Sequence, residues 1–92
     1  MSLPLDAYRI KLVNKILNAC SGENAQRFVD TALKTLERRK VNGYIIARFI
    51  DKVISQLELY NPLVTDPYQW INVLSAKQFL YRKREQLLNI AR

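Results

Sequence analysis

Residues 43–60, GYIIARFIDKVISQLELY, decide the fold class of this chain. Their apolar residues recur with a period close to that of an α-helix and do not alternate as they would in a strand. The segment is rich in β-branched residues, which favour strands, but the periodicity outweighs that preference. One face of the predicted helix is therefore apolar along its whole length, and it comprises Ile46, Phe49, Ile50, Val53, Ile54, Leu57 and Tyr60.

Two further helices are predicted on the N-terminal side of this segment, with Gly22 and Gly43 between the pieces. Segment 24–39 has an apolar face opposite a charged one. The apolar residues of segment 5–20 span about 200° of the helix circumference, which is wider than an ordinary surface helix needs. We therefore expect helix 5–20 to contact several neighbours or a second chain. Cys20, at its end, is expected to act as a small buried apolar residue.

The C-terminal third predicts two helices rather than one. Asp66 followed by Pro67 is typical of a helix start, because an N-cap acceptor precedes a proline at the first helical position. Trp70, Ile71 and Leu74 form one apolar stripe, but beyond Ser75 the apolar residues shift by about half a turn of the helix. The sequence SAKQ that begins at this serine also fits a capping box, so a break is expected there.

The predicted fold is therefore an all-α, compact antiparallel bundle of four to five helices, in a single domain over residues 1–92. No strand alternation persists along the chain. The expected helices lie at about 5–20, 24–39, 43–60, 66–74 and 75–91.

The composition argues against catalysis and metal binding. The 92 residues include no histidine, one cysteine and two glycines. Histidine is the usual general base near neutral pH and the commonest metal ligand, and two glycines cannot build a glycine-rich phosphate loop. We therefore predict a protein that is not an enzyme and that has no cofactor and no metal site. The single cysteine, with no signal-peptide pattern and no long apolar run, predicts a cytoplasmic protein without membrane association.

The formal net charge of +7 is unevenly distributed. Residues 76–92 hold five basic residues and one acidic residue, whereas residues 44–75 hold two basic and three acidic residues. Clustered cations predict either a nucleic-acid-binding surface or ordinary solvated helix faces. The second interpretation is favoured, because consecutive residues on a helix point in different directions. The candidate nucleic-acid or anion contacts are Arg38, Arg39, Lys40, Lys77, Arg82, Lys83 and Arg84.

Segment 60–70, YNPLVTDPYQW, contains two prolines, two tyrosines and the single tryptophan. One interpretation is an aromatic recognition loop, because tyrosine and tryptophan are enriched at binding interfaces. The favoured interpretation is a proline-stiffened connection in which Trp70 and Leu63 close the end of the bundle.

The favoured function is a non-enzymatic protein–protein interaction module that self-associates as a dimer or binds another protein. Its basis is the surplus of apolar surface on the first and last helices, which one small bundle does not cover. The alternative is a nucleic-acid-binding protein that uses its basic C-terminal helix. The candidate interface residues are Tyr68, Trp70, Tyr81 and Leu88.

Overall fold

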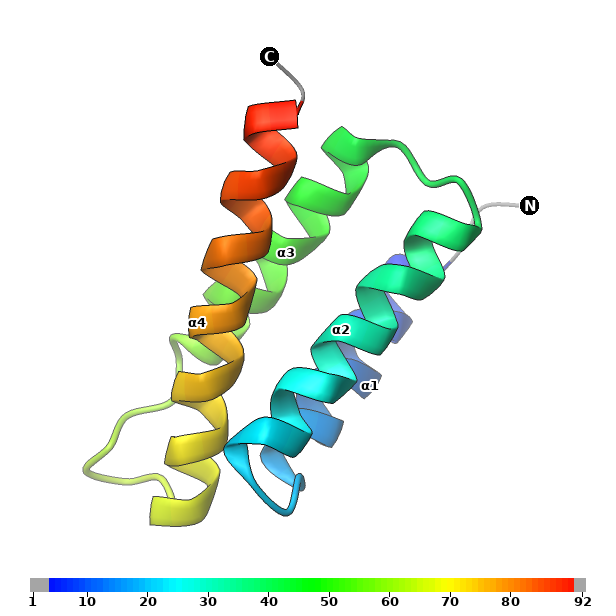
Figure 1. Ribbon diagram of the computed structural model, residues 1–92. Coiled ribbons are helices and arrows are strands. Elements are labelled where there is room, and N and C mark those ends of the chain that lie inside the picture. Colours follow the sequence, from blue (N-terminus) through cyan, green and yellow to red (C-terminus); the bar gives the residue numbers. More distant parts are fainter. Residues whose placement is uncertain (1–3, 91–92) are drawn as a thin grey trace.

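The computed structural model describes residues 4–90, and within that range it contains four helices and no strand (Figure 1). Successive helices run in opposite directions, and α4 packs against the other three, whereas α2 and α3 touch only marginally. The predicted all-α antiparallel bundle is confirmed, with four helices. Their bounds are α1 (Leu5–Leu17), α2 (Gly22–Arg38), α3 (Gly43–Leu57) and α4 (Pro67–Ile90).

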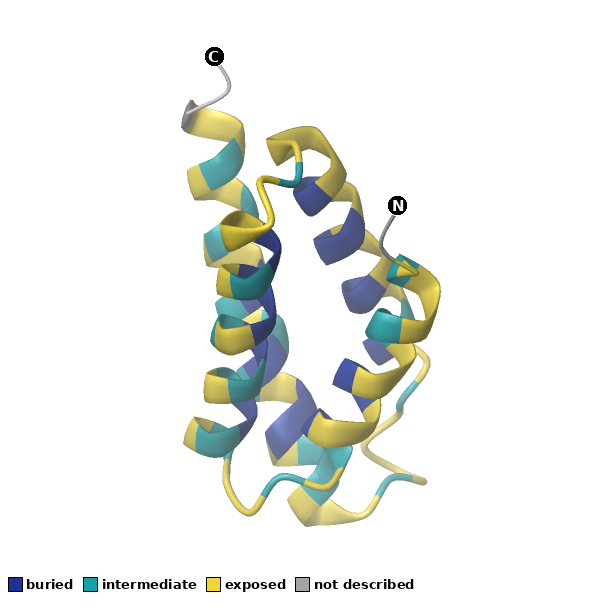
Figure 2. Ribbon diagram, turned by 90° about the vertical axis from the view of Figure 1, so that its right-hand side faces the viewer, coloured by how far each residue is buried: buried dark blue, intermediate teal, exposed yellow. Residues whose placement is uncertain are grey.

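The core lies between the inward faces of the four helices (Figure 2). In α3 the six apolar residues that the sequence places on one face, from Ile46 to Leu57, are all buried. Tyr60, just beyond the helix, packs partly against them. Burying each such large aliphatic side chain contributes about 1.5–3 kcal/mol, so α3 supplies the largest share of the core. The other helices contribute Leu12, Val13, Ile16, Ala25, Val29, Ala32, Leu33, Leu36, Val73, Ala76 and Leu80.

α1 is shorter and less buried than its sequence predicts. It ends at Leu17, and Ser21 instead caps α2, where its hydroxyl oxygen accepts a hydrogen bond of 3.1 Å from the N–H of Asn24. The backbone is extended at this cap, so Cys20 lies in the turn and is exposed. The expectation of a buried Cys20 is therefore wrong. Ile10 is also 49% exposed, so only part of the wide apolar arc faces the core.

The turn between α2 and α3 is a Schellman motif. The N–H of Lys40 donates to the carbonyl of Glu37 at 2.9 Å, and the N–H of Val41 donates to that of Leu36 at 3.1 Å. Lys40 takes a left-handed backbone conformation, with φ of 58°, at the position where glycine is usual. Asn42 then caps α3 through its side chain. These contacts fix Lys40 and its neighbours at one end of the bundle.

α4 runs unbroken through Ser75, so the predicted division into helices at 66–74 and 75–91 is wrong. Its predicted start is confirmed, because the carboxylate of Asp66 accepts a hydrogen bond of 2.9 Å from the N–H of Tyr68. The predicted break depends on placing Ile71 and Leu74 in the core, but both side chains are exposed. The inward side of α4 includes a regular apolar stripe of Val73, Ala76, Leu80 and Leu87, beside which Trp70 and Phe79 also pack partly against the core.

Polar contacts attach the N-terminal half of α4 to the corner between α1 and α2. Asn72 is buried, and its amide nitrogen donates to the carbonyl of Ala19 at 2.9 Å. The amide nitrogen of Gln26 donates to the carbonyl of Ser75 at 3.2 Å. The helices approach so closely here that a Cβ at Gly22 would stand 3.1 Å from the Cβ of Ser75, and closer still to its hydroxyl oxygen. This corner therefore sets the rotation of α4 and the face that it turns to solvent.

Candidate interaction surface

A row of exposed apolar side chains follows the outer surface of α4. Ile71, Leu74, Tyr81 and Leu88 are 53%, 39%, 38% and 44% exposed, and the two polar residues between them are exposed as well. The intervals of three and four residues are those of the a and d positions of a heptad repeat. We call this row the α4 seam, and it comprises Ile71, Leu74, Gln78, Tyr81, Glu85 and Leu88. At the helical rise, it is about 25 Å long.

Contacts with α3 hold the centre of the α4 seam in place. The hydroxyl of Tyr81 donates a hydrogen bond of 2.9 Å to the carboxylate of Glu58. The guanidinium carbon of Arg84 lies 5.2 Å from the centroid of the Tyr81 ring, and Arg84 donates to the carboxylate of Asp51 at 2.8 Å. The Tyr81 side chain is therefore held at its hydroxyl by Glu58 and at its ring by Arg84.

These contacts also shift two acid–base equilibria. The hydrogen bond to Glu58, followed by burial and by the negative charge of Glu58, raises the pKa of Tyr81 above its ordinary value of about 10. The hydrogen bond to Asp51 raises the pKa of Arg84. Near neutral pH the surface therefore presents an uncharged phenol beside a charged guanidinium.

The consecutive basic residues of α4 point in three directions. Arg82 is exposed, whereas Lys83 lies with its ammonium 5.5 Å from the Phe79 ring centroid, in a hollow shared with α2. Arg84 turns to Asp51 of α3. Lys77, seven residues before Arg84, is half-buried. The four candidate cations of α4 therefore do not converge into one anion-binding fork.

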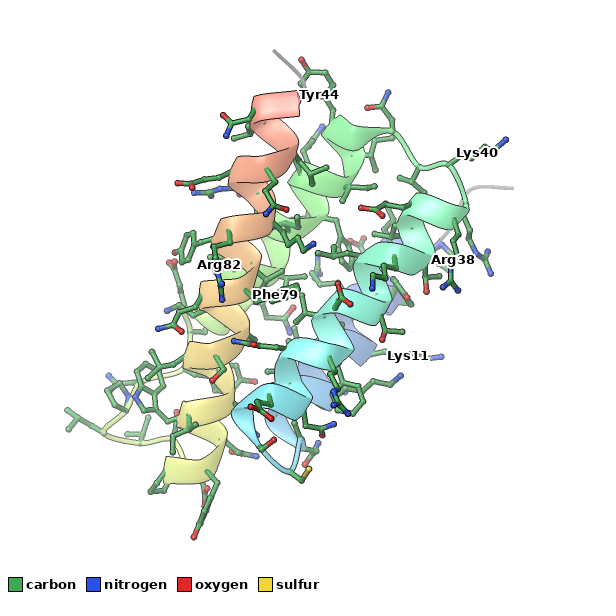
Figure 3. All side chains as sticks on the ribbon, viewed as in Figure 1. Lys11, Arg38, Lys40, Tyr44, Phe79 and Arg82 are labelled. Carbon is green, nitrogen blue, oxygen red and sulfur yellow. The ribbon has the colours of Figure 1, made fainter. Side chains whose placement is uncertain are left out.

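The second basic cluster lies elsewhere on the bundle. Arg38 is in the last turn of α2, and Arg39 and Lys40 follow in the turn after it, all of them exposed. Figure 3 shows Arg38 and Lys40 at the C-terminal end of α2, on the other side of the view from Arg82 of α4. The two clusters thus lie on different helices and on different sides of the bundle.

Segment 60–70 behaves as a connection at its C-terminal end and as an exposed loop at its centre. Trp70 packs partly against the core, as predicted. Leu63 does not, since it is 89% exposed, and its predicted role in closing the bundle is wrong. Val64 and Tyr68 are also strongly exposed, so this loop adds apolar surface near the start of the α4 seam.

Ile71 and Leu74 belong to the seam, although the sequence analysis places them in the core. The signal that identifies them is the heptad spacing they share with Tyr81 and Leu88, both of which the sequence analysis selects as interface residues. That spacing becomes decisive only when the helix is known to continue through Ser75.

The described residues hold no group of three or more His, Cys, Asp or Glu side chains that is placed to bind a metal ion. None of the helices in the described part of the chain is long and apolar enough to cross a membrane.

Comparison of the chain with protein-family models, with curated proteins and with solved structures finds no match in any of the three.

Proposed function

We propose that this protein is a non-enzymatic interaction module whose α4 seam binds a helix of another protein. The observation that carries the proposal is the row of four exposed apolar side chains at heptad intervals. Exposed apolar side chains that gather along one side of a helix are a feature of interaction sites in globular proteins. Alternating intervals of three and four residues suit a second helix that crosses α4 at about 20°.

The charges beside the α4 seam favour an acidic partner. Lys77 and Arg84 flank the seam on the side nearer α3, and Arg82 flanks it on the other side, at the e and g positions of the heptad. Acidic residues at the corresponding positions of a partner helix would face these cations. The net charge of +7 adds long-range attraction for such a partner.

A second copy of this chain fits the same surface less well. In an antiparallel pair of α4 seams, Ile71 faces Leu88 of the other copy, but Leu74 faces Glu85. The same register brings Lys77 toward Arg84, and like charges that meet at an interface oppose association. We therefore propose a heterotypic complex, with the homodimer as the competing outcome.

Two synthetic helical peptides test the proposal. Both carry three heptads with isoleucine and leucine at a and d, and they differ only in having glutamate or lysine at e and g. We expect this protein to bind the glutamate peptide with a dissociation constant in the micromolar range, about −8 kcal/mol, and the lysine peptide far more weakly. Isothermal titration calorimetry measures both affinities, and sedimentation of the protein alone reports any homodimer.

Matched variants locate the binding. Leu74→Ser combined with Leu88→Ser should weaken the glutamate peptide about tenfold or more, because buried apolar anchors dominate helix-in-groove binding. Ile10→Ser on α1 removes an equally exposed apolar side chain and should change nothing. Equal weakening by the two variants, or equal affinity for the two peptides, contradicts the proposal.

The nucleic-acid alternative draws support from net charge alone. A duplex DNA titration at several salt concentrations tests it, because phosphate contacts give a steep salt dependence. If the double substitution Arg82→Ala and Arg84→Ala reduces the slope of log affinity against log salt concentration, nucleic acid is favoured over the helical partner.

We further propose a cytoplasmic location. Cys20 is a free and exposed thiol, which suits a reducing compartment. Detection of the reduced thiol in protein isolated under alkylating conditions would support this, and a disulfide-linked form would oppose it.

A further inference from the structure

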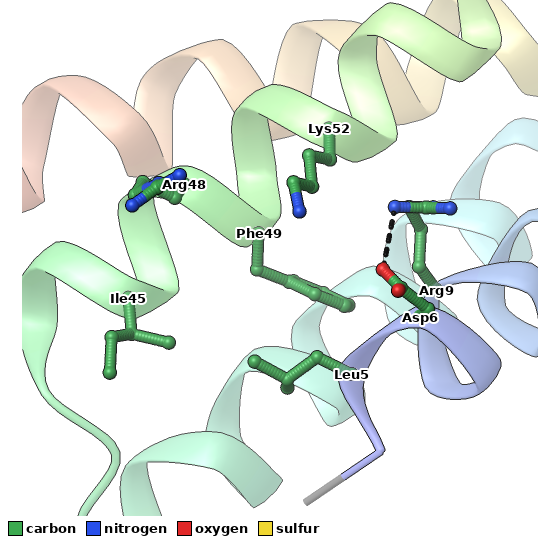
Figure 4. A pocket seen from close by; sticks show the side chains of 7 residues that line it. All are labelled: Leu5, Asp6, Arg9, Ile45, Arg48, Phe49 and Lys52. Carbon is green, nitrogen blue, oxygen red and sulfur yellow. Dashed lines mark hydrogen bonds and ion pairs between the residues drawn. The ribbon is translucent and has the colours of Figure 1, made fainter.

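A pocket opens between α1 and α3, on residues that do not belong to the α4 seam (Figure 4). Its volume is about 170 Å³. The apolar part of its lining consists of Leu5, Ile45 and Phe49, and the Phe49 ring stacks on Tyr8 at a centroid distance of 6.0 Å. Ile45 is 45% exposed, so part of an apolar wall faces solvent.

Three cations surround this apolar lining. Arg9 is held in place by hydrogen bonds to Asp6 at 3.1 Å and to Gln56 at 3.2 Å. Arg48 and Lys52 lie one helical turn apart on α3, above Phe49 in Figure 4, and neither forms an ion pair among residues 4–90. Like charges at this spacing destabilise a helix, and a bound anion would relieve that repulsion.

The acidic groups near the pocket already have basic partners. Asp6 pairs with Arg9, and Asp51, which lines the neighbouring hollow, pairs with Arg84. Arg48 and Lys52 are therefore the two cations of the lining that form no ion pair within residues 4–90. An anionic ligand would meet Arg48 and Lys52 with its charged group and the apolar wall with its body.

We propose that this pocket binds a small organic carboxylate whose apolar part is about the size of one aromatic ring. The volume sets the size, since a cavity of about 150 Å³ lined by aliphatic and aromatic side chains holds one benzene molecule. The carboxylate lies between Arg48 and Lys52, and the ring packs against the exposed Ile45 and the half-buried Leu5. This site is independent of the helical partner proposed above.

Three small molecules distinguish the contribution of the aromatic ring from that of the carboxylate charge. Phenylacetate carries both the ring and the charge, phenylacetamide carries the ring alone, and acetate carries the charge alone. In a ¹H–¹⁵N NMR titration, phenylacetate should shift the amides around Ile45, Phe49 and Lys52 at millimolar concentrations or below. We expect phenylacetamide to bind about threefold to fivefold more weakly, the effect of losing one solvent-accessible charge pair. Acetate should also bind more weakly, because it lacks the ring and therefore its apolar contact with the pocket.

Variants of exposed residues complete the test without disturbing the core. Arg48→Gln and Lys52→Gln should each weaken phenylacetate about threefold and reduce the difference from phenylacetamide. Arg82→Gln, on α4, removes an equal and exposed charge from a helix that does not line the pocket and should have no effect. The proposal is overturned if phenylacetate fails to bind, if it shifts amides elsewhere, or if phenylacetamide binds equally well.

Discussion

Glycine occupies the first helical position of both α2 and α3, but the surroundings of the two glycines differ. A Cβ at Gly22 would press on Ser75, whereas a Cβ at Gly43 would meet no atom within 4 Å. Neither glycine has positive φ, so alanine can adopt both backbone conformations. A comparison of alanine substitutions at the two glycines therefore measures the effect of the close approach of α2 to α4.

We predict opposite effects for the two alanine substitutions. Gly43→Ala should raise the free energy of unfolding by about 0.5 kcal/mol, because it restricts the unfolded chain. Gly22→Ala should lower it by about 1 kcal/mol, because Ser75 must shift. Urea denaturation measures both. A double-mutant cycle with Ser75→Gly should show favourable coupling to Gly22→Ala, and equal stabilisation by both alanines would refute the close approach.

The phenol of Tyr81 gives a second residue-scale prediction. Because its pKa is raised in the folded protein, the neutral phenol contributes stability that is complete below about pH 10 and is lost as the pH rises through the folded pKa. Above pH 10 the free energy of unfolding of the parent protein should therefore fall as the phenol ionises, and Tyr81→Phe should show a smaller fall. Denaturation curves at several pH values measure both. Tyr68→Phe, at a strongly exposed tyrosine, is the matched control and should leave the pH profile unchanged. Identical profiles for the two variants would contradict the shifted pKa.

At the scale of single elements, the continuity of α4 is the feature with most consequence for function. A helix that restarted at Ser75 would leave the next three N–H groups without acceptors inside the helix. In the unbroken helix the N–H groups of residues 76–78 donate hydrogen bonds within the helix, and one of these residues, Ala76, is buried. Native-state hydrogen exchange should therefore find the amides of 76–78 protected to the same degree as those of 80–83. Rapid exchange confined to 76–78 would indicate a break.

The sequence predicts α3 well and α4 poorly for a physical reason. Every inward position of α3 between Ile46 and Leu57 is apolar, so periodicity alone identifies the face. In α4 a polar residue, Asn72, takes an inward position because the carbonyl of Ala19 accepts its hydrogen bond. That partner is 53 residues away in the chain, and sequence periodicity carries no information about it.

The candidate surface is likewise only half predictable. Tyr81 and Leu88 stand out because they lie seven residues apart, away from the inward stripe. Ile71 and Leu74 join them only when the rotation of α4 is known, since an apolar residue in a helix is ordinarily assigned to the core. Cys20 shows the same limit, because a helix end that moves by three residues changes a buried position into an exposed turn.

At the scale of the whole molecule, charge and apolar surface are arranged separately. The +7 charge is spread over several faces, whereas the exposed apolar side chains of α4 form one row with cations on both sides. In the proposed interaction, the spread positive field would attract acidic molecules in general, and the apolar row would select among them a helix with heptad spacing. Specificity therefore requires both features, and exchanging the local charges should exchange the partner.

Reversal of the peptide preference tests this central claim most directly. Lys77→Glu combined with Arg82→Glu reverses two of the three charges that flank the α4 seam and leaves the Arg84–Asp51 pair intact. Calorimetry should then show tighter binding of the lysine-flanked peptide than of the glutamate-flanked one. Arg38→Glu combined with Lys40→Glu changes the net charge equally at the far end of α2 and should keep the original preference. If both double variants still prefer the glutamate peptide, or both reverse together, the α4 seam does not select the partner.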